Sequence, residues 1–245
     1  MNVMFLTDNE QLLTRVKETV MGKLRKELAA HRFSYAYSPA NQAFRRKYAE
    51  ADWIKPVSVN KDVDYLIDNF DVVISLHCKQ FFPQALVNGV RCINVHPGLN
   101  PYNRGWFPQV FSIINGLPLG ATIHEIDEEL DHGAIIAQEE VTVHPWDTSN
   151  SAYERVLDAE MRLLEANLPA ILEGTYQKQA SHEGNLNLKR DFDALCKLDL
   201  NSVDTLQNHL NKLRALTHGA YKNAYFLDEE GNKVYVKVVL EKEER

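Results

Sequence analysis

The chain has 245 residues, 44% of them hydrophobic and 25% charged, which is enough for one large domain or a medium domain with a small one. Its net charge of −7 gives no basic field that would favour nucleic acid or an acidic membrane as a partner. The three cysteines are odd in number and irregularly spaced, which argues against a disulfide framework and favours a reducing compartment. The first residues lack a basic leader and no apolar run is long enough to span a membrane, so we expect a cytoplasmic protein.

The first half of the chain alternates strand-like and helix-like segments. The apolar run Val3–Leu6 predicts a buried strand, and apolar residues then recur at helical spacing from Leu12 to Leu28. The next expected elements are a strand at 33–37, a short helix within 39–51, a strand at 56–59, a helix at 61–69, a strand at 71–76, a helix at 82–87 and a strand at 90–95. This alternation predicts an α/β fold with a mostly parallel sheet that helices cover on both faces. No Gly-x-Gly-x-x-Gly follows the first strand, so a dinucleotide fingerprint is absent.

The second half continues with a buried helix at 106–115 and strands at 121–126 and 134–143, separated by an acidic loop. Ser151 and Glu154 have capping-box spacing, and the long helix after them is expected to bend or restart at Pro169 and to end at Gly174. Residues 176–190 are polar and predict a linker or a ligand loop. The tail is expected to form a small α+β appendage, with a helix at about 203–216 and a hairpin of 224–227 with 234–240.

A polar loop follows the strand 90–95, at the strand end where α/β folds build their sites. Asn94 and His96 are two residues apart on an extended segment and therefore point to the same face. An Asn amide can stabilise a developing oxyanion, and a histidine can move a proton in either direction. Asp131, which lies two residues before Gly133, is the best candidate for the carboxylate that fixes the histidine tautomer. From spacing alone, however, a capped strand end and a solvated acidic loop are favoured.

Other residues allow two interpretations each. Cys78 beside His77 and Lys79 suits an activated thiol, but core packing is more common at such a position. Lys79 and Arg104 suit phosphate binding or a plain surface role, and Tyr102, Trp106 and Phe107 suit a pocket wall or the core. A group of histidines and aspartates has metal-ligand types without a metal-ligand spacing, so a solvated turn is favoured there: His124, Asp127, Asp131 and His132.

The loop from Asn94 to Gly105, taken with Asp131-His-Gly-Ala-Ile-Ile-Ala-Gln, resembles the formyltransferase family that uses N10-formyltetrahydrofolate. The resemblance covers residues 1–175 and implies a Rossmann-like formyltransferase catalytic domain there, followed by a substrate-binding and dimerisation appendage at 176–245. In that family an Asn, a His two residues on and an Asp form the catalytic set, which falls on Asn94, His96 and Asp131. The resemblance implies that the amine attacks the formyl carbon, that Asn94 and a protonated His96 stabilise the oxyanion, and that Asp131 orients the imidazole and helps to move protons.

Three further segments, 75–83, 103–109 and 214–226, are similar to sugar nucleotide N-formyltransferases, with Gly219 standing where relatives are expected to have proline. This narrower resemblance implies that the substrate carrying the amine is a dTDP-linked 4-amino-4,6-dideoxy sugar and that no metal takes part. It also implies a homodimer, and a product that is used for a surface polysaccharide such as the O-antigen of lipopolysaccharide. It implies folate contacts from His77, Cys78, Gln80, Phe81, Phe82, Asp131, His132 and Gly133. It implies sugar nucleotide contacts from Asn9, Lys79, Tyr102, Asn103, Arg104, Trp106 and Tyr221, with Tyr221 stacked on thymine.

Several alternatives stay open within and outside this family. A 3-amino sugar nucleotide is an alternative substrate, and methionyl-tRNA is another, although the acidic balance and the short tail count against it. A glycinamide ribonucleotide formyltransferase would be shorter, and a formyltetrahydrofolate hydrolase usually carries an N-terminal regulatory domain. A catalytically inactive ligand-binding regulator and a metallohydrolase built on His96, His124 and Asp131 are the outside alternatives.

Overall fold

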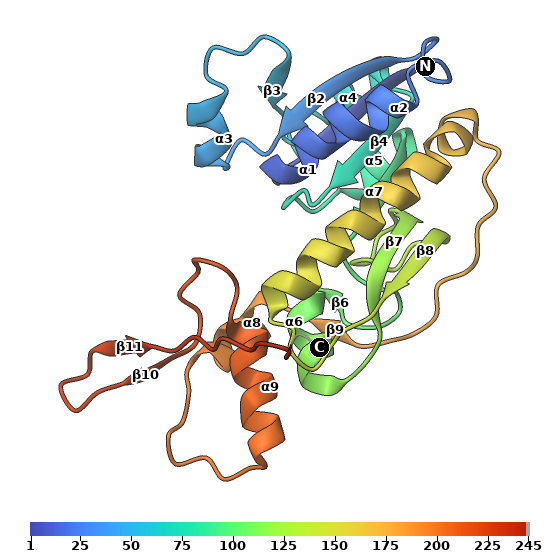
Figure 1. The fold of residues 1–245 in the computed structure, drawn as a ribbon. Coiled ribbons are helices and arrows are strands. Elements are labelled where there is room, and N and C mark those ends of the chain that lie inside the picture. The colour runs from blue at the N-terminus through green and yellow to red at the C-terminus, as the bar shows by residue number, and fades with distance from the viewer. Residues whose placement is uncertain (244–245) are drawn as a thin grey trace.

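The computed structural model describes residues 1–243, so the last two residues of the expected appendage lie outside the described part. One 7-stranded sheet runs through the molecule in the order β3-β2-β1-β4-β5-β7-β8 (Figure 1). Five strands are parallel: β1 (Asn2–Thr7), β2 (Arg32–Tyr37), β3 (Ile54–Pro56), β4 (Val72–Leu76) and β5 (Arg91–His96). The strands β7 (Leu119–Glu125) and β8 (Ile135–Val141) join them antiparallel. The expected α/β fold with a mostly parallel sheet is confirmed.

Alternate residues of β1 enter two separate cores, which shows how the sheet is covered. Val3 and Phe5 lie on the face of the sheet that α1 (Glu10–Arg15) and α7 (Ser149–Glu173) cover, whereas Met4 and Leu6 lie on the opposite face. That opposite face is covered by α4 (Val63–Asn69) and α5 (Gln84–Gly89). Because both faces are buried, β1 and β4 are mainly apolar, and the polar residues Thr7 and Ser75 lie at or next to the carboxyl ends of these strands.

The first helical segment is less regular than its apolar spacing predicts. It consists of α1, a π-helical turn Val16–Val20 and α2 (Met21–Lys23), with turns rather than helix up to residue 30. The short helix α3 (Gln42–Lys47) lies where a helix was expected. The strand expected at 56–59 lies at Ile54–Pro56, and the helix expected at 82–87 lies at Gln84–Gly89.

The helix α7 starts and continues differently from the sequence expectation. Thr148 is its N-cap and forms a reciprocal capping box with Ser151, so the expected box of Ser151 and Glu154 is wrong. The helix is 25 residues long and includes Pro169 in its interior, so it does not restart at this proline. It ends at Gly174, whose φ of 70° is the left-handed conformation that favours glycine at a helix C-terminus.

The segment 176–190 contains more structure than a linker. Its strand β9 (Leu186–Asn187) pairs in parallel with β6 (Arg104–Gly105), and Gln179 forms an isolated bridge with Ile135. The helix α6 (Pro108–Asn115) follows β6 as expected for a buried helix. Gly105 has a φ of 90°, and a Cβ there would lie 2.4 Å from the carbonyl oxygen of Asn187, so only glycine fits beside β9.

The C-terminal part forms a small α+β unit, as expected. The helix α8 (Lys189–Cys196) was not expected, and α9 (Leu206–Leu216) begins later than 203. The hairpin of β10 (Tyr225–Leu227) and β11 (Lys233–Tyr235) is shorter than expected and projects from the body of the molecule (Figure 1). Cys196, Leu216 and Ala224 belong to the same buried cluster as the central strands. No helix within residues 1–243 is both long and apolar enough to cross a membrane.

Candidate active site

A cleft of about 1010 Å³ lies at the carboxyl ends of β1, β4 and β5. Residues from the loops after these strands meet there with the start of α7 and with residues of the C-terminal unit. Twelve of the residues expected at the site line it: Asn9, His77, Cys78, Lys79, Gln80, Phe81, Phe82, Asn94, His96, Trp106, Asp131 and Tyr221. Five expected residues are not part of its lining in the described structure: Tyr102, Asn103, Arg104, His132 and Gly133.

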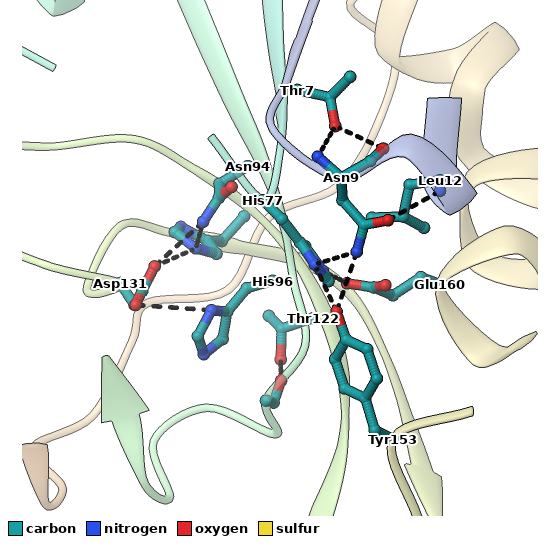
Figure 2. A network of polar contacts seen from close by, with 12 residues as sticks. Thr7, Asn9, Leu12, His77, Asn94, His96, Thr122, Asp131, Tyr153 and Glu160 are labelled. Carbon is teal, nitrogen blue, oxygen red and sulfur yellow. Dashed lines mark hydrogen bonds and ion pairs between the residues drawn. The ribbon is translucent and has the colours of Figure 1, made fainter. Parts of the chain in front are cut away.

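The fold brings Asn94, His96 and Asp131 together (Figure 2). Asn94 and His96 point to one face of β5, and Asp131 reaches them from the loop between β7 and β8. The Asn94 amide nitrogen donates to Asp131 Oδ1 at 3.0 Å, and His96 Nδ1 lies 3.5 Å from Asp131 Oδ2. One carboxylate therefore positions both an amide and an imidazole.

Backbone contacts fix the position of Asp131. The N–H of Gly105 donates to its Oδ2 at 3.1 Å, and the side chain of Asn100 donates to its carbonyl oxygen at 2.8 Å. Asp131 has a φ of 50°, a left-handed conformation that Asp tolerates better than most residues. A Cβ at Gly133 would lie 1.9 Å from the carbonyl oxygen of Glu125, so this glycine allows the loop to fold back against β7.

Burial determines the charge state of the pair formed by His96 and Asp131. Burial lowers the pKa of His96 to about 4, although the charge of Asp131 acts in the opposite direction. Burial alone would raise the pKa of Asp131, but His96, His124 and the Gly105 N–H together hold it at about 2. At neutral pH the carboxylate is therefore ionised and the imidazole is neutral, so a proton on His96 has to come from a bound ligand or from solvent.

The second ring nitrogen of His96, Nε2, is buried and makes no hydrogen bond within the described residues. Since Nδ1 faces the carboxylate and carries the hydrogen, Nε2 presents a lone pair. A Cβ at Gly98 would lie 2.4 Å from this nitrogen, so Gly98 leaves the space that the ring occupies. The arrangement equips His96 to accept a proton.

Two residues of β7, His124 and Thr122, belong to the site and were not predicted in these roles. His124 pairs in register with Asn94, and Thr122 pairs with His96. His124 Nε2 lies 3.2 Å from the Asn94 amide nitrogen and 3.5 Å from Asp131 Oδ1. Polar residues at alternate positions of an otherwise apolar strand were the signal that could have identified them.

Thr122 holds the backbone of the central loop. Its hydroxyl donates to the carbonyl oxygen of Gly98 at 2.7 Å and accepts from the backbone N–H of Asn100 at 3.1 Å. Gln138 of β8 adds a bond to the same hydroxyl at 3.0 Å and a bond to the Asn100 carbonyl at 2.7 Å. The loop that carries His96 is therefore fixed from the neighbouring strands.

The expected contact residues of the central loop have different surroundings. Asn103 is completely buried and binds Ser112, Asn115 and Asn185 through its side chain. Arg104 is also buried, and two of its guanidinium nitrogens have no partner within residues 1–243. Tyr102 is partly exposed, and His132 pairs with Asp127 at 3.1 Å.

A second polar network lies on another part of the cleft wall (Figure 2). His77 Nε2 lies 2.7 Å from Glu160 of α7, and its Nδ1 lies 3.0 Å from the hydroxyl of Tyr153. Asn9 donates to that hydroxyl at 3.0 Å. Glu160 is completely buried, and burial raises its pKa, although the charge of His77 acts in the opposite direction.

Two alternative chemistries find no support in this geometry. Burial raises the pKa of the Cys78 thiol to about 12, so this residue is not an activated nucleophile at neutral pH. Within residues 1–243 no three His, Cys, Asp or Glu side chains are arranged to hold a metal ion. His96 and His124 instead face separate oxygens of the Asp131 carboxylate.

Comparisons with known proteins agree on one family. Residues 17–168 match the model of the formyl transferase family, and residues 191–242 match an N-formyltransferase dimerization C-terminal domain. The chain is 56% identical over 186 residues to a dTDP-4-amino-4,6-dideoxyglucose formyltransferase of Mycobacterium tuberculosis, a match that covers 76% of this chain and 80% of the relative.

Solved structures give the same result over the whole chain. A sugar N-formyltransferase from a Shewanella species is 44% identical, with a TM-score of 0.94, over 100% of this chain and 99% of that one. A 4-N formyltransferase from Francisella tularensis is 43% identical, with a TM-score of 0.90, over 98% of each chain.

Proposed function

Because this chain belongs to the formyl transferase family, we propose that it transfers a formyl group from N10-formyltetrahydrofolate to the 4-amino group of dTDP-4-amino-4,6-dideoxyglucose. The single observation that carries the reaction type is the assembly of Asn94, His96 and Asp131 in the cleft. The substrate follows from the Mycobacterium tuberculosis relative, whose name specifies dTDP-4-amino-4,6-dideoxyglucose, and the match over the full length of this chain is to a sugar N-formyltransferase.

His96 is the proton acceptor of this proposal. The sugar nitrogen bonds to the formyl carbon, and the bond between that carbon and N10 of the folate then breaks. The amine loses a proton as its nitrogen becomes an amide, and N10 gains a proton as tetrahydrofolate leaves. The lone pair of His96 Nε2 is available because burial lowers the pKa of the ring and keeps it neutral. Asp131 then stabilises the imidazolium through Nδ1, 3.5 Å away. The expected protonated form of His96 thus arises during the reaction rather than before it.

Asn94 acts on the oxygen of the formyl group as charge develops there. Its amide nitrogen has two hydrogens, which face Asp131 and His124 in this structure. Sharing one of them in a three-centre bond allows Asn94 to donate to the oxyanion without losing its position. Removal of such a donor lowers catalytic rates by about 10²–10³-fold in other enzymes.

The walls of the cleft differ in character, which supports separate places for the two ligands. Phe82, Ile126 and Leu130 provide apolar surface beside Asp131, and this part suits a planar pterin. Polar and aromatic parts of the lining come from Asn9, Trp106 and Tyr221. Lys79 is the one Lys or Arg side chain among its described lining residues, so we place the diphosphate near Lys79 and the thymine against Tyr221.

The assembly and setting of the protein are part of this proposal. The matches to residues 17–168 and 191–242 support a catalytic domain at 1–175 and a dimerisation and substrate-binding appendage at 176–245. We place the homodimer in the cytoplasm, in agreement with three free cysteines, Cys78, Cys92 and Cys196. A nucleotide-linked sugar is an activated glycosyl donor, which is the reason for placing the product before assembly of a surface polysaccharide such as the O-antigen.

A substrate panel tests the proposal. The purified protein is incubated with N10-formyltetrahydrofolate and a series of 3-amino and 4-amino dTDP-hexoses and UDP-hexoses, and a mass increase of one formyl group is measured. We expect product from dTDP-4-amino-4,6-dideoxyglucose, and none in a His96→Asn variant. Product from a 3-amino sugar alone would change the assigned position, and formylation of methionyl-tRNA without any sugar product would overturn the substrate class.

A further inference from the structure

The network of Asn9, His77, Tyr153 and Glu160 takes no part in the proton transfer at His96. Asn9 follows β1, His77 follows β4, and the other two residues lie on α7 (Figure 2). Asn9, His77 and Tyr153 line the cleft, whereas Glu160 lies behind them and is completely buried. A buried carboxyl group is costly unless it serves a partner, so the hydrogens of this network need to be assigned.

The orientation of Asn9 is fixed by its role as a helix cap. Its Oδ1 accepts the backbone N–H of Leu12 at 3.1 Å, so its amide nitrogen must be the atom that faces Tyr153. This nitrogen donates to the Tyr153 oxygen at 3.0 Å. The oxygen can accept one further hydrogen bond and still has its own hydrogen to donate.

The direction of that hydrogen depends on the proton count of His77 and Glu160. With the lower count, Nε2–H donates to the carboxylate, and Nδ1 presents a lone pair that accepts the Tyr153 hydrogen. With one more proton, Nδ1 carries a hydrogen, whether the added charge lies on the ring or Glu160 is the acid. Tyr153 then accepts from both Asn9 and His77, and its own hydrogen is free to point into the cleft.

We propose that Tyr153 is a hydrogen-bond donor to an oxygen of the bound sugar nucleotide, and that His77 and Glu160 are positioning residues that turn its hydroxyl toward this ligand. The inference rests on the proposed function. Tyr153 packs edge-on against His218, with ring centroids 5.6 Å apart, and His218 in turn lies 5.7 Å from Tyr221. Tyr153 therefore belongs to the side of the cleft assigned to the nucleotide rather than to the apolar side beside Phe82.

The surroundings favour retention of the added proton. Glu160 Oε2 has no hydrogen-bond partner within residues 1–243, which makes the ionised form costly without a cation on His77. Burial also raises the pKa of Tyr153, so its hydroxyl keeps its hydrogen and remains a donor. Other titratable or charged groups also face this network. They are Arg15 of α1, His96 of β5, Glu154 of α7, and His218 and Tyr221 after α9.

The first experiment examines the switch without any ligand. Histidine is labelled with ¹⁵N, the ring nitrogens of His77 are assigned with a His77→Gln variant, and their protonation is followed by NMR between about pH 5 and about pH 8. We expect Nδ1 to gain a hydrogen as the pH falls. An Nδ1 that keeps one state throughout this range would overturn the role given to His77 and Glu160.

The second experiment measures binding of a dTDP-hexose that lacks the amine, so that neither turnover nor a titrating amine contributes. Calorimetry on the wild-type protein is expected to show affinity falling roughly tenfold as the pH rises through this range, because a donor to the ligand is lost. Tyr153→Phe is expected to bind roughly tenfold more weakly at the low end and to show no such pH dependence. An unchanged pH dependence in Tyr153→Phe would overturn the role of Tyr153.

Matched variants on α7 separate charge from folding. Glu160→Gln removes the charge that holds the proton, so its transition is expected at lower pH. Glu165→Gln makes the same change at a residue of α7 paired with Lys23 and is expected to leave the transition in place. Tetrahydrofolate affinity should stay constant in Tyr153→Phe, Glu160→Gln and Glu165→Gln. If the wild-type protein bound no dTDP-hexose, the proposed substrate would be wrong, whereas the NMR result would still decide whether the switch exists.

Discussion

Oδ2 of Asp131 lies 3.5 Å from Nδ1 of His96 while it also accepts the backbone N–H of Gly105 at 3.1 Å. The carboxylate is thus held from the central loop itself, and the imidazole can only present Nε2 to the cleft. Proton acceptance at His96 therefore depends on a charge that is delivered from another loop, between β7 and β8.

The charge of Asp131 can be removed without changing its shape. In Asp131→Asn, the imidazolium formed during the reaction loses its stabilisation, and we expect kcat to fall by about 10²–10⁴-fold with a much smaller change in KM for the sugar. Steady-state kinetics with both substrates measure this. Asp64→Asn, at an exposed position of α4 outside the cleft lining, is the control and should stay near the wild-type rate. A near-normal kcat in Asp131→Asn would contradict the assigned role.

Acid should destabilise the protein through His96. Its folded pKa of about 4 lies below the ordinary value of 6.5, so between these pH values the unfolded chain binds a proton that the folded protein does not. The free energy of unfolding therefore falls as the pH drops through this window, by about 3 kcal/mol from this residue. Urea unfolding at several pH values measures the slope. In His96→Asn this part of the slope should disappear, and an unchanged slope would show that His96 is not the group responsible.

Gly98 should be intolerant of a side chain. A Cβ there would lie 2.4 Å from His96 Nε2, so the imidazole in Gly98→Ala must move away from its position. The ring would then be misplaced relative to the sugar amine whose proton it accepts. We expect kcat to fall by about 10²-fold while the thermal midpoint changes little. Gly22→Ala has nothing within 4 Å of the new Cβ and serves as the control. Equal activity in both variants would contradict the assigned position of His96.

Asn103 offers a test between the sequence expectation and the structure. The side chain is completely buried and binds Ser112 and Asn115 at 3.0 and 2.8 Å. Asn103→Ala should therefore lower the free energy of unfolding by about 1–3 kcal/mol and leave KM for the sugar nucleotide nearly unchanged. The exposed Asn69→Ala is the control for stability. A raised KM at constant stability would restore the expected role as a substrate contact.

The proposed dimer should depend on exposed apolar residues of the C-terminal unit. Val203 and Leu206 are 98% and 73% exposed, within the range that matches the dimerization domain. Charge is costly at a buried interface, so the double change Val203→Asp with Leu206→Asp should shift the protein toward the monomer in light scattering. Ala29→Asp, exposed on the N-terminal part, should not. A wild-type protein that is already monomeric at all concentrations would overturn the dimer.

The central strands and the catalytic set could be predicted because their signals are local and strong. Mainly apolar runs marked β1, β4 and β5, and the loop after β5 carried a recognisable pattern with Asp131. His124 was missed because its role depends on the register between β5 and β7, which spacing within one strand does not reveal. The strand β9 was missed because two residues have no periodicity, and it exists only where β6 pairs with it.

The pairing of β6 with β9 also determines when the active site can be completed during synthesis. Arg104 and Gly105 are held by Leu186 and Asn187, and Gly105 in turn donates to Asp131. A nascent chain that has emerged only to residue 175 contains Asn94, His96 and Asp131 but lacks the strand that fixes their loop. Catalytic competence therefore comes late in translation, and a fragment cut at the boundary between the two expected domains would hold the chemical groups without their final geometry.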